Sequence, residues 1–288
     1  MKELAFIKRS NGQHWVGDGF PVRNIFSYHD IAEEISPFLM MDYAGPATFP
    51  ATSHRLGVGQ HPHRGFETVT IVYDGGVSHR DSSGGGGTIG PGDVQWMTAA
   101  SGLIHEEYHS PDFARTGGTF EMVQLWVNLP ARDKMAPPGY QGITAGEIPR
   151  VALPDGAGEA RIIAGRFGEA AGPARTFTPM NVWDLRLHAH HRVTLSLPQG
   201  HTTALFVLKG AIRLGDRHPV RTAELAVMER RGTELVMEVE EETTLLLLNG
   251  APLNEPIVGH GPFVMNTQEE IVQAIHDYNR GRFGQIGR

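Results

Sequence analysis

Short apolar runs of strand length, each closed by glycine, proline or a polar residue, dominate this chain of 288 residues. The clearest of these runs cover residues 68–73, 94–97, 122–129, 205–208 and 243–248. They combine β-branched and aromatic residues with alternating or continuous apolar character, which is typical of short strands. Between them stand 36 glycines and 19 prolines, residues that punctuate closely spaced turns. The sequence therefore predicts an all-β fold.

The chain is longer than one average domain, so two domains are the starting expectation. Residues 130–154 are rich in proline and glycine and lack a sustained period, and we interpret them as a connector with the boundary near Tyr140. The strand, glycine turn and strand of residues 68–81 recur in residues 202–216, and residues 91–97 have a counterpart in 223–228. This weak internal repeat predicts two tandem β-barrels, in domains 1–140 and 141–288.

One helix is expected, at the C-terminal end. Thr267 and Glu270 have the spacing of a capping box, Ile271 and Ile275 lie at helical spacing, and Gly281 supplies a stop. We predict a helix over residues 268–280 that packs on the outside of a barrel.

Composition excludes several classes of function. The chain has no cysteine, so disulfides and thiolate sites are excluded and any metal must bind through nitrogen and oxygen. A net charge of -7 argues against direct nucleic-acid binding. The most apolar stretch, residues 245–248, is far too short to cross a membrane, and no secretory signal is evident. A cytoplasmic protein without membrane association is the simplest expectation.

Two histidine-containing pairs suggest a metal site. His61 and His63 are two residues apart in a strand-like segment, and His105 and Glu107 repeat that spacing. Residues i and i+2 of a strand point to one face, so each pair can reach a single ion. An isolated His-x-His among 15 histidines is a weak signal, but two such pairs flanking one glycine-rich hairpin are stronger. Three imidazoles and a carboxylate suit one divalent first-row transition metal.

Four longer segments resemble signature blocks of the pirin family. They are HPHRGFETVT from His61, PGDVQWMTAASGLIHEE from Pro91, QLWVNLP from Gln124 and EPIVGHGPFVMNT from Glu255. The resemblance implies two tandem cupin barrels of the jelly-roll type, with a single metal in the N-terminal barrel only. By position it assigns the ligands to His61, His63, His105 and Glu107. It favours iron(II), with zinc, manganese, cobalt, nickel and copper as alternatives.

The carboxylates near these histidines need separate assignments. Glu67 occupies the place at which the general cupin motif has a ligand, and strand parity turns it toward the metal unless Gly65 introduces a bulge. The pirin pattern instead puts the ligating carboxylate after the third histidine, at Glu107. We therefore expect Glu67 to orient a ligand imidazole, and Glu106, on the opposite face, to be a solvated charge.

Other conspicuous residues carry weaker signals. His188, His190 and His191 include a His-x-His pair, but residues 223–235 offer no partner histidine, so we predict a C-terminal barrel without a metal. The role of His260 stays open. Residues 84–87 form a glycine run without the lysine and helix of a phosphate-binding loop, which predicts a hairpin loop. Ser82 and Ser83 lack a nucleophile-elbow context.

The resemblance also implies a function. Bacterial members of the family are associated with the oxidative opening of flavonols by the reaction of quercetin 2,3-dioxygenase. Such a site would bind a flavonol and dioxygen, and Glu107 or Glu67 would take the proton of the flavonol's 3-hydroxyl. The alternative is a non-enzymatic, redox-sensitive regulator whose metal shapes a surface for a protein partner.

Overall fold

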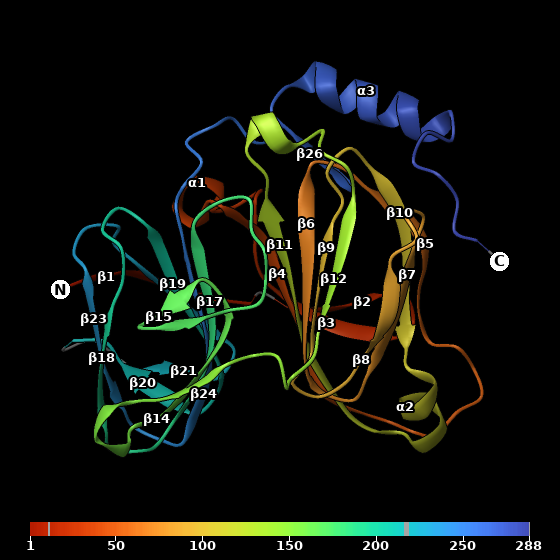
Figure 1. Cartoon of the computed structure of the whole chain (residues 1–288). Coiled ribbons are helices and arrows are strands. Elements are labelled where there is room, and N and C mark those ends of the chain that lie inside the picture. The colour runs from red at the N-terminus through yellow and green to blue at the C-terminus, as the bar shows by residue number, and fades with distance from the viewer. Residues whose placement is uncertain (11, 216–218, 288) are drawn as a thin grey trace. The chain divides into compact units, whose positions relative to one another are not determined.

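The structure is a computed structural model that describes residues 1–10, 12–215 and 219–287. It divides into two compact units built almost wholly of antiparallel strands (Figure 1). We call them the N-terminal barrel (residues 12–30, 38–145 and 254–287) and the C-terminal barrel (residues 1–10, 31–37 and 146–253). The predicted all-β fold with two barrels is confirmed.

The N-terminal barrel consists of a seven-stranded sheet and a four-stranded sheet that face each other (Figure 1). In spatial order the larger sheet comprises β12 (Gly139–Ile143), β9 (Val94–Thr98), β6 (Phe66–Asp74), β11 (Gly118–Asn128), β4 (Phe38–Phe49), β3 (Phe20–Ser27) and β2 (Gln13–Val16). The smaller sheet comprises β5 (Gly57–His63), β10 (Leu103–His109), β7 (Val77–Asp81) and β8 (Gly86–Ile89). The remaining elements are α2 (Pro111–Thr116), the 3-10 helix η1 (Ala131–Asp133), and the paired strands β25 (Val258–His260) and β26 (Phe263–Met265).

The C-terminal barrel has the same plan. Its seven-stranded sheet comprises β1 (Leu4–Arg9), β22 (Glu224–Met228), β19 (Thr202–Lys209), β24 (Thr243–Gly250), β17 (Met180–Leu187), β14 (Gly158–Ala164) and β13 (Arg150–Ala152). Its four-stranded sheet comprises β18 (Arg192–Ser196), β23 (Glu234–Val239), β20 (Ala211–Arg213) and β21 (Val220–Arg221). Two short strands, β15 (Arg166–Phe167) and β16 (Ala170–Ala171), the helix α1 (Ala32–Ile35) and the 3-10 helix η2 (Pro154–Gly156) complete it. Asp216, the last residue of the second repeat segment, lies outside the described residues.

The compact units differ from the predicted continuous domains 1–140 and 141–288. The N-terminal strand β1 pairs with β22 of the C-terminal barrel, and the C-terminal helix belongs to the N-terminal barrel. The predicted connector also adds a strand to the seven-stranded sheet of each barrel, because β12 pairs with β9 and β13 pairs with β14. Strands pair through backbone hydrogen bonds, which do not require an alternating pattern of side chains. The composition of residues 130–154 therefore did not reveal these strands.

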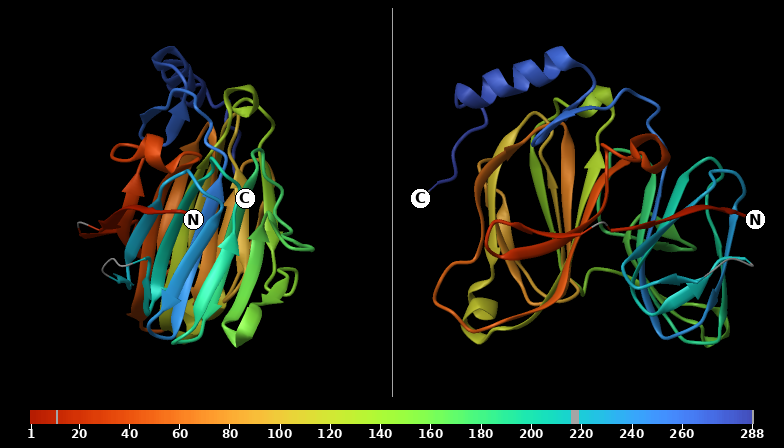
Figure 2. Two further views of the ribbon diagram at one scale, coloured as in Figure 1. Left: turned by 90° about the vertical axis from the view of Figure 1, so that its left-hand side faces the viewer. Right: turned by 180° about the vertical axis from the view of Figure 1, so that it is seen from behind.

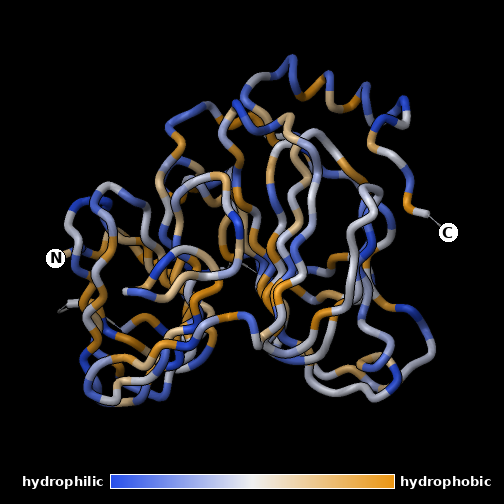
Figure 3. Tube along the Cα trace, viewed as in Figure 1, coloured by the Kyte–Doolittle hydropathy of each residue, from blue (hydrophilic) through white to orange (hydrophobic). Residues whose placement is uncertain are grey.

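The helix α3 (Gln268–Asn279) begins at the predicted capping box, in which Thr267 accepts from the Glu270 amide while the Glu270 side chain accepts from the Thr267 amide. It lies along the outside of the N-terminal barrel (Figure 2), with hydrophobic and hydrophilic positions mixed along its length (Figure 3). Ile271 and Ala274 pack in one cluster with Phe263. The predicted helix is confirmed. Among the described helices none is both long and apolar enough to span a bilayer.

The two interiors are filled differently. The C-terminal barrel holds one large cluster of buried apolar side chains, drawn from nearly every strand of both sheets. The buried apolar cluster that crosses the N-terminal barrel is smaller and aromatic-rich, with Phe20, Phe113 and Phe120 among its members. The remaining interior of the N-terminal barrel contains buried histidines and carboxylates, including His63, His105 and Glu107.

Candidate metal centre

Neighbouring strands of the smaller sheet bring the predicted residues together. His61 and His63 end β5, His105 and Glu107 lie on β10, and His61 is the direct ladder partner of His105. Opposite residues in an antiparallel pair share a face, as do residues two apart on one strand. All four side chains therefore belong to the face that looks into the barrel.

Each of the three imidazoles has its Nδ1 atom engaged by a neighbour. Nδ1 of His61 lies 2.8 Å from the Gly59 carbonyl oxygen, and Nδ1 of His63 lies 3.3 Å from that of Pro262. A carbonyl only accepts, so these Nδ1 atoms donate, and in a neutral ring Nε2 then carries the lone pair. Within the described part of the chain, the buried Nε2 of His105 has no hydrogen-bond partner. This orphaned atom is an observation that a bound cation would explain.

The three rings are close enough for one ion. Ligand atoms of His61, His63 and His105 lie within 4.8 Å of one another, and the ring centroids are 4.2 to 4.9 Å apart. Burial, with a smaller contribution from neighbouring histidines, lowers the pKa of His63 and His105 well below the usual range. Neutral imidazole is the form that ligates metals.

Glu107 approaches the cluster from the other side of His105. Its ligand atom lies within 4.8 Å of those of His79 and His105. Glu107 is not a member of the group of ligand atoms formed by His61, His63 and His105. Glu107 nevertheless lines the same cavity as His61 and His63. Gln95 Nε2 donates to Glu107 Oε1, and Thr70 Oγ1 lies 3.4 Å from that oxygen. The larger sheet thus holds the carboxylate from across the barrel.

A cavity of about 220 Å³ adjoins these residues. Its walls are mostly apolar side chains of β2, β3, β4, β5 and β11, with Asp42 and Gln124 as polar groups besides the site residues. Trp126 contacts the His63 ring, with centroids 5.2 Å apart. A few polar groups converging in an apolar pocket are what a small-molecule site requires.

Sequence reasoning missed His79 and Asp81. They lie on β7, whose ladder with β10 pairs His79 with Glu107 and Asp81 with His105, and both are buried. In the segment GVSHRD, His79 and Asp81 are two residues apart, as are the residues of the other two pairs. This spacing is the feature of the sequence that could have identified them.

Glu67 does not face the site, so the prediction that it orients a ligand imidazole is wrong, and the parity is broken at Gly65. Thr70, which reaches Glu107, lies three residues from Glu67 on β6, and an odd separation puts Glu67 on the opposite face of the sheet. There Glu67 accepts a hydrogen bond from Thr98 Oγ1 at 2.7 Å. The cause is the turn between β5 and β6, where Gly65 has φ +92° and a Cβ would collide with the Val264 carbonyl. This turn interrupts the alternation carried from His63.

Glu106 is buried, not solvated as predicted. Arg55 and Arg80 both donate to Glu106 Oε1, at 3.0 and 2.6 Å. Burial opposes ionisation, but the two guanidinium groups lower the pKa of Glu106 overall. The outward face of β10 is therefore covered by arginine side chains.

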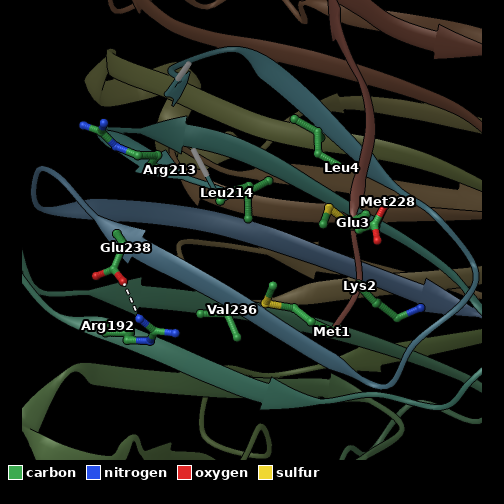
Figure 4. A pocket seen from close by; sticks show the side chains of 11 residues that line it. Met1, Lys2, Glu3, Leu4, Arg192, Arg213, Leu214, Met228, Val236 and Glu238 are labelled. Carbon is green, nitrogen blue, oxygen red and sulfur yellow. Dashed lines mark hydrogen bonds and ion pairs between the residues drawn. The ribbon is translucent and has the colours of Figure 1, made fainter. Parts of the chain in front are cut away.

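The C-terminal barrel offers no comparable cluster among its described residues. His188 and His190 are exposed, and His188 pairs with Glu242 at 3.2 Å. A pocket of about 640 Å³ in this barrel is lined by Met1, Lys2, Glu3, Leu4, Arg192, Arg213, Leu214, Gly215, Met228, Val236 and Glu238 (Figure 4). Arg192 and Glu238 form an ion pair there, but no imidazole lines the pocket. His260, on β25, is exposed.

The paired sheets of each unit and the inward histidine pairs define the chain as a protein with two cupin-type domains. Two family models match it, the pirin model over residues 19–127 and the pirin C-terminal cupin domain over residues 182–284. The chain belongs to the pirin family. The resemblance inferred from the sequence is confirmed.

Relatives of known name cover nearly the whole chain. A Pseudomonas aeruginosa protein named "Putative quercetin 2,3-dioxygenase" is 59% identical over 98% of this chain and 99% of its own. A Caulobacter vibrioides pirin-like protein is 38% identical over 88% and 89% of the two chains. The crystal structure of a quercetin 2,3-dioxygenase from Acinetobacter baumannii is 54% identical, covers all of both chains and superposes with a TM-score of 0.96. A pirin from Escherichia coli, crystallised with nickel(II), is 18% identical with a TM-score of 0.67 over 86% and 99% of the two chains, which shows the shared fold.

Proposed function

We propose that this protein is a metal-dependent dioxygenase that opens flavonols such as quercetin, with its metal held by His61, His63, His105 and Glu107. The observation that carries the proposal is the convergence of three imidazoles, those of half-buried His61 and of buried His63 and His105, whose Nδ1 atoms are all engaged. The Pseudomonas and Acinetobacter relatives, at 59% and 54% identity, bear the name of this activity.

The residues present fit a transition metal. Three neutral nitrogens and one carboxylate are donors suited to iron, manganese, cobalt, nickel, copper or zinc, and iron(II) is the ion that the family resemblance favours. A bound divalent ion supplies a Lewis acid for the flavonol's 3-oxygen and a position for dioxygen. Substrate enclosure and proton transfer belong to the protein's own side chains.

Glu107 is the group suited to accept the proton of the 3-hydroxyl. Its Oε1 accepts from Gln95 Nε2, whereas Thr70, whose single hydroxyl hydrogen is donated to Gln124 Oε1 at 2.7 Å, lies 3.4 Å away. A carboxylate held in this way needs little rearrangement to take a proton from a neighbouring hydroxyl. Glu67, the other carboxylate that the sequence offers for this role, lies on the opposite face of the sheet and is no part of the proposal.

The apolar walls of the adjoining cavity suit an aromatic ring. Val16, Phe20 and Met122 line it together with Trp126. At about 220 Å³ it is smaller than the roughly 300–1,000 Å³ typical of pockets that enclose a drug-sized ligand. We therefore propose that it takes the flavonol's reacting end, with the rest of the molecule extending outside.

The test is aerobic turnover of quercetin by holoprotein of verified metal content. We expect loss of quercetin's visible absorption, consumption of dioxygen and release of carbon monoxide, all stopped by chelation and by His105→Ala. Free metal oxidises flavonols unaided, so the control is the His105→Ala protein supplemented to the same total metal.

A holoprotein no faster than that control would overturn the dioxygenase proposal. It would favour the regulatory alternative, for which the readout is association with a protein partner in only one oxidation state of the metal.

A further inference from the structure

His79 and Asp81 extend the candidate centre by one more strand. Asp81 is the ladder partner of His105, and His79 that of Glu107, so both face the same interior as the candidate ligands. His79, Asp81 and His105 are at most 4% exposed. Nε2 of His79 lies 3.2 Å from Asp81 Oδ2, and its Nδ1 lies 3.3 Å from Nδ1 of His105. A carboxylate and two imidazoles thus form one buried chain.

The hydrogen bonds around Asp81 determine which atom donates and which accepts between Asp81 and His79. Asp81 Oδ1 accepts from the Ser83 amide at 2.8 Å, the Ser83 hydroxyl at 2.6 Å and the Gly85 amide at 3.0 Å. These donors come from the glycine-rich hairpin, and a Cβ at Gly85 would lie only 2.5 Å from Asp81 Oδ2. An ionised carboxylate accepts at both oxygens, so the partner of Asp81 at Oδ2 must be a donor.

The hydrogen positions on the two imidazoles follow from this direction. If Nε2 of His79 donates to Asp81, Nδ1 of a neutral His79 ring is an acceptor. Its neighbour, Nδ1 of His105, must then carry a hydrogen, which leaves the lone pair of His105 on Nε2. That atom is buried and has no hydrogen-bond partner in the described structure. The His79 ring is held in place by Tyr140, which stacks on it at 5.0 Å with an interplanar angle of 12°.

We propose that Asp81 and His79 are positioning residues that hold His105 in the Nδ1–H tautomer and so present its Nε2 lone pair to the metal. This rests on the proposed metal site. His61 and His63 obtain the same tautomer from backbone carbonyls. The tautomer of His105 instead depends on the side chains of His79 and Asp81. It can therefore be tested by replacing one of these side chains, whereas a backbone carbonyl cannot be removed in this way.

Asp81→Asn is the informative variant because its amide has one favourable orientation. The three donors at Oδ1 require the amide oxygen there, which places the NH₂ group against Nε2 of His79. His79 must then accept at Nε2 and carry its hydrogen on Nδ1, and His105 must accept at Nδ1 and carry its hydrogen on Nε2. The substitution reverses the chain and removes the lone pair from the metal side, although no candidate ligand is altered.

Two measurements test the proposal. The first is long-range ¹H–¹⁵N spectroscopy of the metal-free wild-type protein, in which we expect His105 to be protonated at Nδ1 and His79 at Nε2. A His105 protonated at Nε2, or a doubly protonated His79, would overturn the proposal. Because no metal is present, this result is independent of whether the site binds one.

The second measurement is Co(II) affinity, by competition with a chromogenic chelator. Loss of an outer partner of a ligating histidine weakens metal binding roughly 10- to 100-fold, and we expect a loss in that range for Asp81→Asn. Asp93→Asn is the matched control, because Asp93 also accepts from backbone amides, those of Gly90 and Ala145, and its hydrogen bonds in the described part of the chain do not include a histidine. Equal affinities in the two variants would contradict the proposal, whereas no Co(II) binding by the wild type would contradict the proposed function instead.

Discussion

His61 and His105 are direct partners across the antiparallel ladder of β5 and β10, with ring centroids 4.2 Å apart. The pairing brings together two segments separated by more than forty residues of sequence and gives each a second polar residue two positions away, His63 and Glu107. The smaller sheet of the N-terminal barrel is therefore the scaffold of the candidate centre.

The two candidate carboxylates should differ in their effect on metal binding. Glu107 lies beside His105 and lines the cavity, whereas Glu67 lies on the opposite face of β6. We expect Glu107→Ala to weaken Co(II) binding at least tenfold, and Glu67→Ala to change it less than twofold. Chelator competition on both variants, with unfolding curves as a check of the fold, decides the matter. The reverse order would return the carboxylate to the general cupin position.

The histidines of the C-terminal barrel should be dispensable for metal. His188 and His190 are exposed, and neither belongs to a cluster of ligand atoms in the described residues. Replacing both with glutamine should leave metal content unchanged, as measured by elemental analysis of the purified variant. Loss of metal with the fold intact would show that this barrel carries a ligand.

Lys134 should be essential to the stability of the N-terminal barrel. It is buried, and its Nζ donates to the Gly65 carbonyl, the Asn128 side chain and the Val264 carbonyl at 2.7 to 2.9 Å. Lys134→Met leaves three buried acceptors unpaired, and each costs about 1–3 kcal/mol. We therefore expect the free energy of unfolding to fall by about 3 kcal/mol or more in urea titrations. The exposed Lys209→Met is the control, with an expected change under about 0.5 kcal/mol, and a similar small change for Lys134→Met would refute the structural role.

Glu67 should make the stability of the metal-free protein depend on pH. Burial raises the pKa of Glu67 to about 7 although Thr98 donates to it, so the folded state holds a proton that the unfolded state releases above its ordinary pKa of 4.5. The stabilising contribution is complete below pH 4.5 and is lost as pH rises through 7.

We expect wild type to lose about 3 kcal/mol relative to Glu67→Gln between pH 4.5 and pH 8, since each pKa unit corresponds to about 1.4 kcal/mol. Urea unfolding of both proteins at several pH values measures the difference, in which the other titrating groups cancel. A difference that stays constant with pH would mean that Glu67 ionises normally.

Local sequence patterns predicted what depends on local geometry. The capping box at Thr267 and the same-face pairs at His61 and His105 follow from fixed periods of helix and strand. Glu67 was misplaced because the alternation does not continue through a turn at a left-handed glycine, Gly65. The face of the sheet to which the Glu67 side chain points depends on the register of β6 with β9 and β11. A single sequence does not reveal that register.

Features that depend on distant partners were not predictable. The N-terminal strand β1 finds its partner β22 more than two hundred residues away, and α3 returns to the N-terminal barrel, where Asp277 binds Arg64 at 2.9 Å. His79 and Asp81 were overlooked because a His-x-Asp pair on a strand is an ordinary pattern until the ladder with β10 sets it beside His105. The patterns thus predicted elements and same-face pairs, and the tertiary structure selected which pairs meet.

The most direct test of a single metal centre is the metal content of the purified protein, by elemental analysis of wild type and His61→Ala. The described C-terminal barrel lacks a ligand cluster, so we expect about one transition-metal ion per wild-type chain. A barrel site that loses one of its three imidazoles should bind weakly, so the variant should retain almost none while unfolding with similar cooperativity. A stoichiometry near two ions per chain in the wild type, or full retention of metal by His61→Ala, would contradict a single centre built on these histidines.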